Sequence, residues 1–203
     1  DTSVNTGMSK YDNIQLVRGP DGLFSGNGQP SGSLNLVRKR PQESFQLLTT
    51  LSAGSWENYL GEVDVSSPLT DSGNIRGRLV ASYNDTEKFY DDAHRKNSTV
   101  YGIVEGDVTE RTLISVGASV DRRRGEGSDH APAFPRYSNG TPLPLSRSFG
   151  LPAFSFRDSD SVNYFADLKH HFSDDWVAKL NYSHTESDGG TFLPYYSGAV
   201  NPL

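Results

Sequence analysis

Apolar and polar residues alternate with a period of two in one stretch of this chain after another. In residues 75–84, Ile, Gly, Leu, Ala and Tyr occupy one face, and Arg, Arg, Val, Ser and Asn occupy the other. A strand produces this pattern because its successive side chains point to opposite sides of a sheet. Runs of this kind, two of them with weaker contrast, predict seven strands at 45–53, 59–66, 75–84, 98–108, 113–121, 162–172 and 176–185.

The joins between these runs alternate in length. The second, fourth and sixth runs are followed by the short polar segments SPLTDSGN, TER and SDD, whereas the third is followed by thirteen residues and the fifth by a join that reaches from 122 to 160. The first join, GSWEN, is short and departs from this alternation. Short turns at one end and long loops at the other are typical of outer-membrane barrels.

A soluble β-sandwich would show the same alternation, so the strand pattern alone leaves both folds open. The charges on the polar faces favour the barrel, because a wet or plugged lumen accepts them and a dry core does not. These charges are Glu62, Asp64, Arg76, Arg78, Asp167 and Lys179. Phe172 and Trp176 flank the SDD turn, as aromatic girdle residues do at a membrane interface. We predict an all-β fold, part of a transmembrane antiparallel β-barrel in contact with outer-membrane lipid.

Composition excludes several other classes. The chain has no cysteine, a net charge of −6 and a pI of about 5.3, which argues against a disulfide framework, a cysteine metal site and a nucleic-acid-binding protein. No window approaches 18 apolar residues, which excludes a transmembrane helix. The chain starts at Asp1 without a signal-like run and stops at Leu203 soon after a strand-like segment. We therefore expect it to be a piece of a longer protein.

No residue pattern predicts catalysis, a cofactor or a bound metal, so we expect the protein not to be an enzyme. The five histidines lack His-Glu-x-x-His spacing, and no Gly-x-Ser-x-Gly occurs. His170 and His171 are neighbours on one predicted strand and point to opposite faces, so they cannot share a metal ion. The acidic segments DDAHR, SDSD and SDDW fit solvated loops better than a calcium site.

Residues 11–41 have a different organisation from the alternating runs. Two apolar runs, 14–17 and 34–37, flank a loop with five glycines, and Arg38-Lys39-Arg40 follows. The glycine spacing fits neither a phosphate-binding loop nor a dinucleotide-binding loop, and Pro30 disfavours the helix that either would need. The favoured interpretation is a tight loop between two strands, with glycines at positive φ.

This stretch, YDNIQLVRGPDGLFSGNGQPSGSLNLVRKRP, resembles the end of the plug domain of TonB-dependent outer-membrane receptors. The following GSWENYLGEVDVSSPLTDSGNIRGRLVASYND resembles the first barrel hairpins of the ferric-siderophore branch of that family. Gln15 and Phe24-Ser25 depart from the Glu and Leu-Tyr that are usual in that family. The resemblance covers residues 11–120, and the loops beyond Asp121 match no motif.

The resemblance implies residues 1–43 as the end of a plug and residues 44–203 as the first part of a barrel that has 22 strands in the family. It also implies active import of a ferric siderophore, driven by the TonB energy-coupling complex acting through an N-terminal segment that this chain lacks. Two alternatives stay open. One is import of cobalamin or a glycan by the same architecture, and the other is an outer-membrane barrel adhesin or enzyme.

Candidate functional residues follow from position and from the resemblance. The resemblance implies that Arg18 contacts the barrel wall or lines the ligand chamber, so that its loss would loosen the plug. Aromatic faces at the external loops can pack on flat chelating groups. We expect ligand contacts at Trp56, Phe134, Tyr137, Phe149, Phe154 and Phe156. We also expect Glu62 opposite Arg78 and Asp64 opposite Arg76 across the SPLTDSGN turn.

Overall fold

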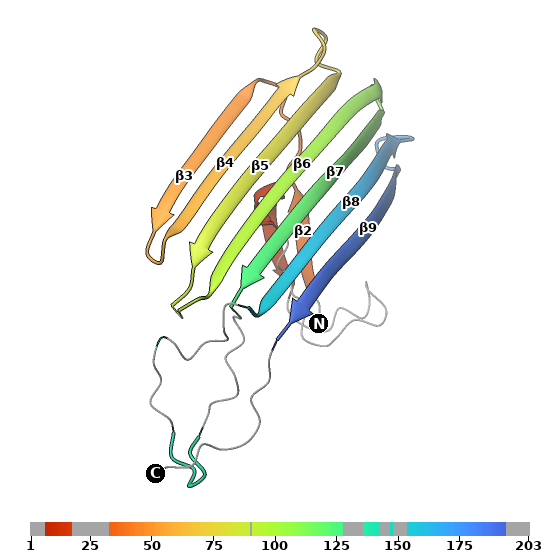
Figure 1. Ribbon diagram of the computed structural model, residues 1–203. Coiled ribbons are helices and arrows are strands. Elements are labelled where there is room, and N and C mark those ends of the chain that lie inside the picture. The colour runs from red at the N-terminus through yellow and green to blue at the C-terminus, as the bar shows by residue number, and fades with distance from the viewer. Residues whose placement is uncertain are drawn as a thin grey trace.

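The computed structural model describes residues 7–17, 33–89, 91–127, 136–142, 147 and 154–193. They form two antiparallel sheets (Figure 1). A single 3-10 turn, η1 (Met8–Lys10), leads into a two-stranded sheet of β1 (Tyr11–Val17) and β2 (Ser33–Arg38). The second sheet has seven strands in sequence order: β3 (Gln46–Gly54), β4 (Asn58–Pro68), β5 (Ile75–Glu87), β6 (His94–Thr109), β7 (Thr112–Glu126), β8 (Phe156–His171) and β9 (Val177–Phe192).

All seven expected strands of the large sheet are present, and most extend further toward the long loops than expected. β8 begins at Phe156 where the alternation predicts 162, and β9 continues to Phe192 where it predicts 185. The added segments carry hydroxyls, charges and glycines on both faces, so their hydropathy does not alternate. Backbone pairing nevertheless continues, because the ladder needs amides and carbonyls and not a lipid-facing apolar side.

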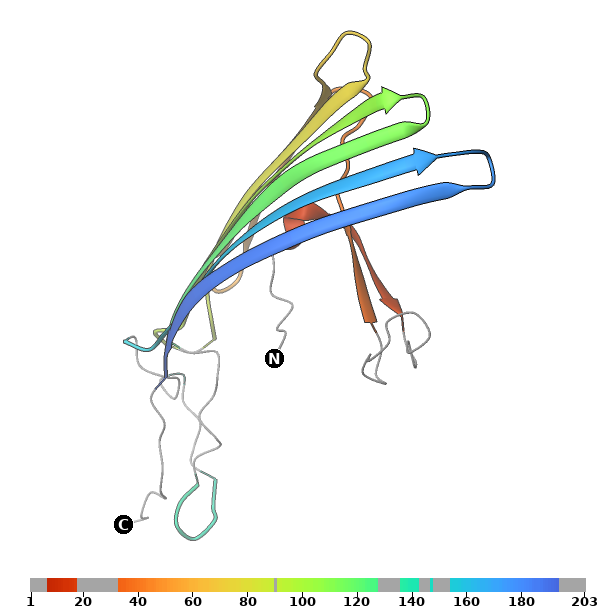
Figure 2. The same cartoon turned by 90° about the vertical axis from the view of Figure 1, so that its right-hand side faces the viewer.

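The large sheet is strongly curved, and η1 with the β1–β2 hairpin lies on its concave side (Figure 2). The most buried side chains of the concave face include an apolar cluster of Val80, Tyr101, Ile103 and Phe165. Buried polar residues surround this cluster: Asp64, Ser66, Thr99, Glu105, Ser115 and Ser119. The concave face is therefore predominantly polar where η1 and the segment around the β1–β2 hairpin contact it.

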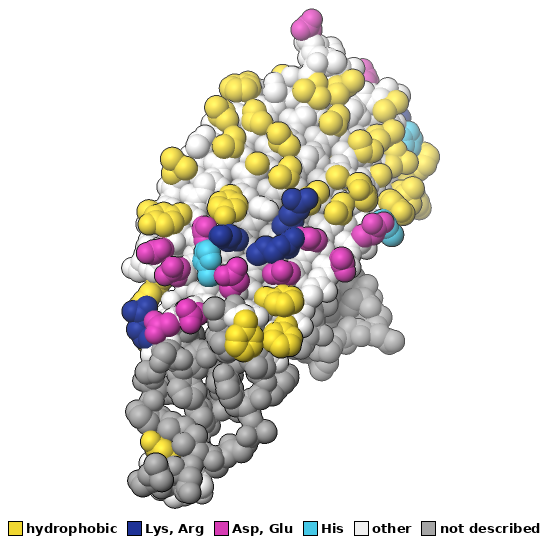
Figure 3. Space-filling model, in the orientation of Figure 1, with side chains coloured by type: hydrophobic (Ala, Val, Ile, Leu, Met, Phe, Trp, Pro, Cys, Tyr) yellow, Lys and Arg dark blue, Asp and Glu magenta, His cyan; other side chains and the backbone are white. Residues whose placement is uncertain are grey.

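The convex face is apolar and exposed. It carries large side chains such as Leu51, Leu79, Val104, Tyr164 and Leu180, between 41% and 83% exposed. These apolar side chains cover much of the sheet in Figure 3, and a band of charged residues crosses it nearer the long loops. Apolar residues facing out and polar residues facing in are the arrangement of a strand wall that lies in a bilayer. Among the described residues no helix is long and apolar enough to cross a membrane.

The expected pairing across the SPLTDSGN turn is wrong in register but right in face. Glu62 lies opposite Ser82 in place of Arg78, a shift of four residues along β5. The cause is the turn: β4 continues to Pro68, and the Leu69 amide donates to the Ile75 carbonyl at 2.8 Å, so the turn is tighter than the apolar pattern indicates. A shift by an even number keeps every side chain on its face, because the side-chain period is two.

Candidate functional site

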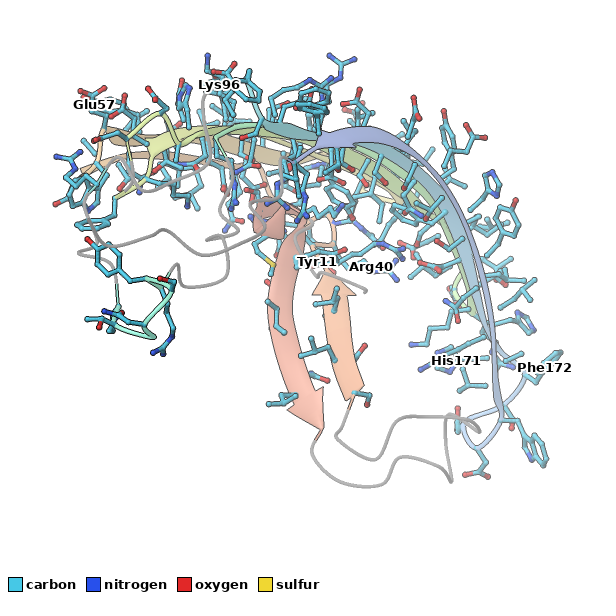
Figure 4. The ribbon with its side chains drawn as sticks, turned by 60° about the horizontal axis from the view of Figure 1, so that its bottom comes forward. Tyr11, Arg40, Glu57, Lys96, His171 and Phe172 are labelled. Atoms are coloured by element: carbon cyan, nitrogen blue, oxygen red, sulfur yellow. The ribbon has the colours of Figure 1, made fainter. Side chains whose placement is uncertain are left out.

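Three consecutive cationic residues at the end of β2 and just after it contact different parts of the concave face, which we call the inner wall. Arg38 ends β2, and Lys39 and Arg40 begin the linker to β3. The Arg38 guanidinium lies 4.1 Å from the centre of the Phe165 ring, a cation–π contact. Figure 4 shows Arg40 beneath the inner wall beside the hairpin, whereas Lys96 projects from the opposite face.

Lys39 joins a buried charge cluster on β4 and β5. Its Nζ lies 2.8 Å from Asp64 Oδ2 and 3.3 Å from Glu62 Oε1. Arg78 donates to the same Asp64 carboxylate from Nε at 2.8 Å and from Nη2 at 2.7 Å. The Asp64 side chain is only 3% exposed, so these donors replace the water that the carboxylate loses on burial.

Arg40 bridges two acids that stand on different strands. Its Nη1 lies 2.6 Å from Glu105 Oε1 on β6, and its Nη2 lies 3.0 Å from Asp167 Oδ2 on β8. Ser115 on β7 accepts a further hydrogen bond from Nη1 at 2.7 Å. Burial works against the charge of Arg40, but the hydrogen bond that Arg40 donates to Glu105 and the charges of both acids outweigh it and raise the pKa of Arg40. The guanidinium therefore stays protonated while it spans three strands.

Lys10 makes the third charged contact, from η1 to β7. Its ammonium pairs with Asp121 and donates to Ser119 Oγ at 3.3 Å, and Thr99 Oγ1 donates to Asp121 at 2.9 Å. Gly7 allows this approach, because a Cβ at that position would overlap Thr99. All three contacts pair a cation of the segment before β3 with acids of the inner wall.

Hydrogen bonds from and to the linker backbone fix it between these ion pairs. The Tyr101 hydroxyl donates to the Lys39 carbonyl at 2.7 Å, and Arg78 Nη1 donates to the Arg40 carbonyl at 2.8 Å. The Gln42 amide donates to Ser66 Oγ at 2.7 Å. The linker is thus held on the wall by side chains from β4, β5 and β6.

Comparison with known proteins places this arrangement in a family. The ferripyoverdine receptor of Pseudomonas aeruginosa is 41% identical over 179 residues, which is 87% of this chain and 22% of that protein. The ferric-pyoverdine M114 receptor PbuA of a Pseudomonas strain is 38% identical over 202 residues, 98% of this chain and 24% of that protein. The solved pyoverdine outer membrane receptor FpvA of P. aeruginosa superposes with a TM-score of 0.89 at 38% identity, over 96% of this chain and 29% of that one. No family model matches.

The chain is a segment of a TonB-dependent receptor. It spans less than a quarter of the length of these two relatives. The seven-stranded sheet of this receptor segment is accordingly part of an outer-membrane barrel wall. The relatives are named as receptors, which agrees with the expectation that the chain is not an enzyme.

Four of the predicted ligand residues of the receptor lie in its described part, at the loop end of the sheet. Trp56 packs edge-on against Phe89 with ring centres 5.5 Å apart, and the Arg147 guanidinium lies 5.1 Å from the Trp56 ring. Tyr137 belongs to a separate small turn in which its amide donates to the Thr141 carbonyl at 2.9 Å. The structure therefore does not bring Trp56 and Tyr137 into one described cluster.

Phe154 and Phe156 are brought together by Phe192 of β9. Their ring centres lie 6.1 Å and 6.3 Å from that of Phe192. Phe156 pairs with Glu126 and Phe192 in the ladder, and the alternation puts it on the convex face of the receptor wall, away from the hairpin. Arg18, Phe134 and Phe149 lie outside the described residues.

The sequence reasoning missed the receptor's charged contacts between the linker and the wall. It noted the basic exit after β2 and the acids of the polar strand faces, but it did not join them. The sequence did carry a signal for these contacts. Three adjacent cations, Arg38-Lys39-Arg40, follow the hairpin, and the acids Glu62, Asp64 and Asp167 had been placed on the inward face, where they could pair with them. Lys10, Glu105 and Asp121 carried no such signal, because each is one charge among many in the sequence.

Proposed function

We propose that the full-length receptor imports a ferric siderophore of the pyoverdine class across the outer membrane. The observation that carries this proposal is the polar inner wall holding a plug segment through Lys10, Lys39 and Arg40, in a chain about two-fifths identical to ferripyoverdine receptors. Charged and hydroxyl contacts suit a plug segment that must move off the wall and return during transport, because water can hydrogen-bond to both groups when they separate.

The energy for that movement comes, in this proposal, from the TonB complex, which pulls on a part of the receptor before residue 1. The plug then ends near residue 43 and the barrel begins near residue 44, where the linker meets β3. The two-stranded sheet lies before this boundary and the seven-stranded sheet after it, which supports the division.

The aromatic residues of the external loops remain our proposed ligand contacts: Trp56, Phe134, Tyr137, Phe149, Phe154 and Phe156. Among these, Phe156 is the weakest candidate for a ligand contact, because it stands on the convex side of the wall. Arg18 remains proposed as a contact between plug and barrel or as part of the ligand chamber.

Growth on ferripyoverdine as the sole iron source tests the proposal. A strain that lacks the full-length gene should fail to grow, and plasmid-borne receptor should restore growth. Restoration should require an intact TonB complex, and growth on ferrous salts should be equal in all strains. Equal growth of the deleted strain on ferripyoverdine and on other ferric siderophores would contradict the proposal.

A further inference from the structure

The charged band on the convex face begins where the apolar side chains of the wall end. Strand β7 shows this border. Residues 112–120 of β7 can cross the hydrocarbon core, because a barrel strand needs about 9–11 residues for that. Their large and small apolar side chains point outward: Ile114, Val116, Ala118 and Val120. The next outward residue is Arg122, which therefore lies at the border on the side of the long loops, at the depth of the external lipid headgroups.

Three cations come together at this border: Lys96, Arg122 and Arg124. We call them the outer basic cluster. Lys96 of β6 lies directly opposite Arg124 in the β6–β7 ladder, and Arg122 is the neighbouring outward residue on β7. Figure 3 shows Lys and Arg side chains gathered in the middle of the band, and Figure 4 shows Lys96 projecting away from the hairpin. Like charges directly opposite each other destabilise a sheet, so this cluster has a cost in the bare wall.

The nearest acid of β8 neutralises one of the three cations. Arg124 donates to Asp160 from both ends of its guanidinium, from Nη1 to Oδ1 at 2.7 Å and from Nη2 to Oδ2 at 2.8 Å. Arg122 is the residue opposite Asp160 in the ladder, but it makes no ion pair with that acid. The two-point pair with Arg124 leaves Arg122 exposed on the convex face.

The nearest acid of β5 does not neutralise Lys96. Asp85 lies opposite Lys96 in the β5–β6 ladder, but its carboxylate hydrogen-bonds with His94 and accepts a bond from the Tyr83 hydroxyl at 3.3 Å. Within the part of the chain that the structure describes, Lys96 and Arg122 form no ion pair, and both side chains are exposed. The cluster therefore holds two free cations at headgroup depth.

Acids on the neighbouring strands limit what the outer basic cluster can bind. The other outward acids of the band stand on β5, β8 and β9 or at the loop end of β7: Glu87, Glu126, Asp158, Glu186 and Asp188. Positive charge is confined to adjoining positions of β6 and β7. One compact anion fits between these acids, whereas an extended anionic surface would meet them and be repelled.

We propose that the outer basic cluster binds a phosphate group of a lipid in the external leaflet of the outer membrane. Arg122 can present a planar fork to two phosphate oxygens, and Lys96 adds a point charge beside it. The acyl chains of the same lipid then lie along the apolar wall, where Val100 and Val120 form the cross-strand pair next to the cluster. This site faces the bilayer, so it is separate from the import of a ligand through the barrel.

Native mass spectrometry of the purified, delipidated full-length receptor tests the site, with lipid A as the probe. The double variant Lys96→Gln, Arg122→Gln should bind lipid A about tenfold to thirtyfold more weakly, as expected for the loss of two cations beside an anionic headgroup. Dephosphorylated lipid A should bind the wild type and the double variant equally. Equal affinity for lipid A in the two proteins, both folded by heat-modifiable gel mobility, would overturn the proposal.

Asp160→Asn gives a change of the opposite sign. It should tighten the binding of lipid A, because Arg124 loses its carboxylate partner and its guanidinium becomes free for the phosphate. Lys169→Gln is the matched control for the loss of a lysine, since Lys169 lines a cavity on the inner wall, and its affinity should equal that of the wild type. Weaker or unchanged binding in Asp160→Asn would overturn the cluster of three cations.

Inorganic phosphate distinguishes a lipid headgroup from a free anion. An equal concentration of phosphate should not displace lipid A, because the lipid also buries its acyl chains on the apolar wall. Displacement, or binding of phosphate but not of lipid A by the wild type, would assign the cluster to a free anion and overturn the lipid. Import is read separately, from growth on ferripyoverdine. A double variant that grows normally but has lost lipid A supports the lipid site without bearing on the import function.

Discussion

Asp64 and Arg78 form a two-point ion pair diagonally across the β4–β5 ladder, with Arg78 Nε and Nη2 at 2.8 Å and 2.7 Å from the two carboxylate oxygens. The residue directly opposite Asp64 is Val80, and the residue opposite Arg78 is Ser66. The diagonal pair leaves the outer edge of the carboxylate for Lys39, which lies 2.8 Å away. One acid of the wall thus pairs both with a cation of the wall and with a cation of the linker.

Replacing Asp64 by Asn should release the linker from the wall. The change leaves Arg78 without its carboxylate partner and Lys39 with Glu62 alone. Removing one member of a buried pair typically costs about 3–5 kcal/mol. In the full-length receptor we expect faster amide hydrogen exchange at Lys39 and Gln42, whose amides donate to the Lys10 carbonyl and to Ser66 Oγ, measured by mass spectrometry. Asp71→Asn is the control, because Asp71 stands in the exposed turn after β4. Unchanged exchange in Asp64→Asn would contradict the assigned role of this pair.

Lysine should not be able to take over the role of Arg40 between the two acids. A lysine keeps the charge but has a single ammonium, which cannot reach Glu105 on β6 and Asp167 on β8 with separate nitrogens. Both Arg40→Lys and Arg40→Gln should make cells more sensitive to vancomycin, a large antibiotic that a seated plug excludes, with the glutamine variant more affected. If Arg40→Lys behaves as wild type, the charge matters and the bridge between the two strands does not.

Gly117 should not tolerate a methyl group. A Cβ there would overlap the Phe165 ring and lie 2.6 Å from the Gly102 carbonyl, and Phe165 carries the Arg38 contact on its ring. Overpacking of this kind costs about 1–3 kcal/mol. We expect Gly117→Ala to lower the yield of folded, heat-modifiable receptor in membranes. Gly106→Ala is the matched control, since a Cβ on Gly106 meets nothing within 4 Å.

Trp56 should report on ligand binding. It is 44% exposed and lies at the tip of the β3–β4 hairpin against Phe89 and Arg147, so a ferric chelate that packs on its free face should quench its fluorescence. In the full-length receptor, Trp56→Phe should lose part of the quenching produced by ferripyoverdine, while Trp176→Phe at the opposite end of the strands should not. Equal quenching in both variants would remove Trp56 from the ligand site and leave it as a residue that packs the loops.

The sequence predicts the strands and their faces better than their ends and partners. The run from Ile75 is recognisable because lipid on one side and water on the other impose alternation. The first residues of β8 lack that signal, since Asp158 and Asp160 stand where both faces are polar. The pairing of Glu62 was mispredicted because a shift of four residues leaves the hydropathy pattern unchanged.

The charged contacts of Lys10, Lys39 and Arg40 depend on tertiary placement. Arg40 and Asp167 are 127 positions apart, and no local pattern relates them. Their meeting requires the curvature of the sheet and the return of the hairpin across its concave side. The sequence shows that the residues after β2 are cations, but it does not show which acids they pair with.

The backbone hydrogen bond from the Lys39 amide to the Lys10 carbonyl, at 2.9 Å, closes the open end of the β1–β2 hairpin. A force applied to the chain ahead of Gly7 therefore acts on the hairpin in the unzipping direction and not in shear. In unzipping, each bond carries the load alone and breaks before the next is strained, so the peak force is small although the total work is not. Lys10 and Asp121 separate first, the Lys39–Lys10 bond follows, and the ladder then opens pair by pair toward Val17, while Lys39 and Arg40 keep the β2 side of the open end tethered to the wall.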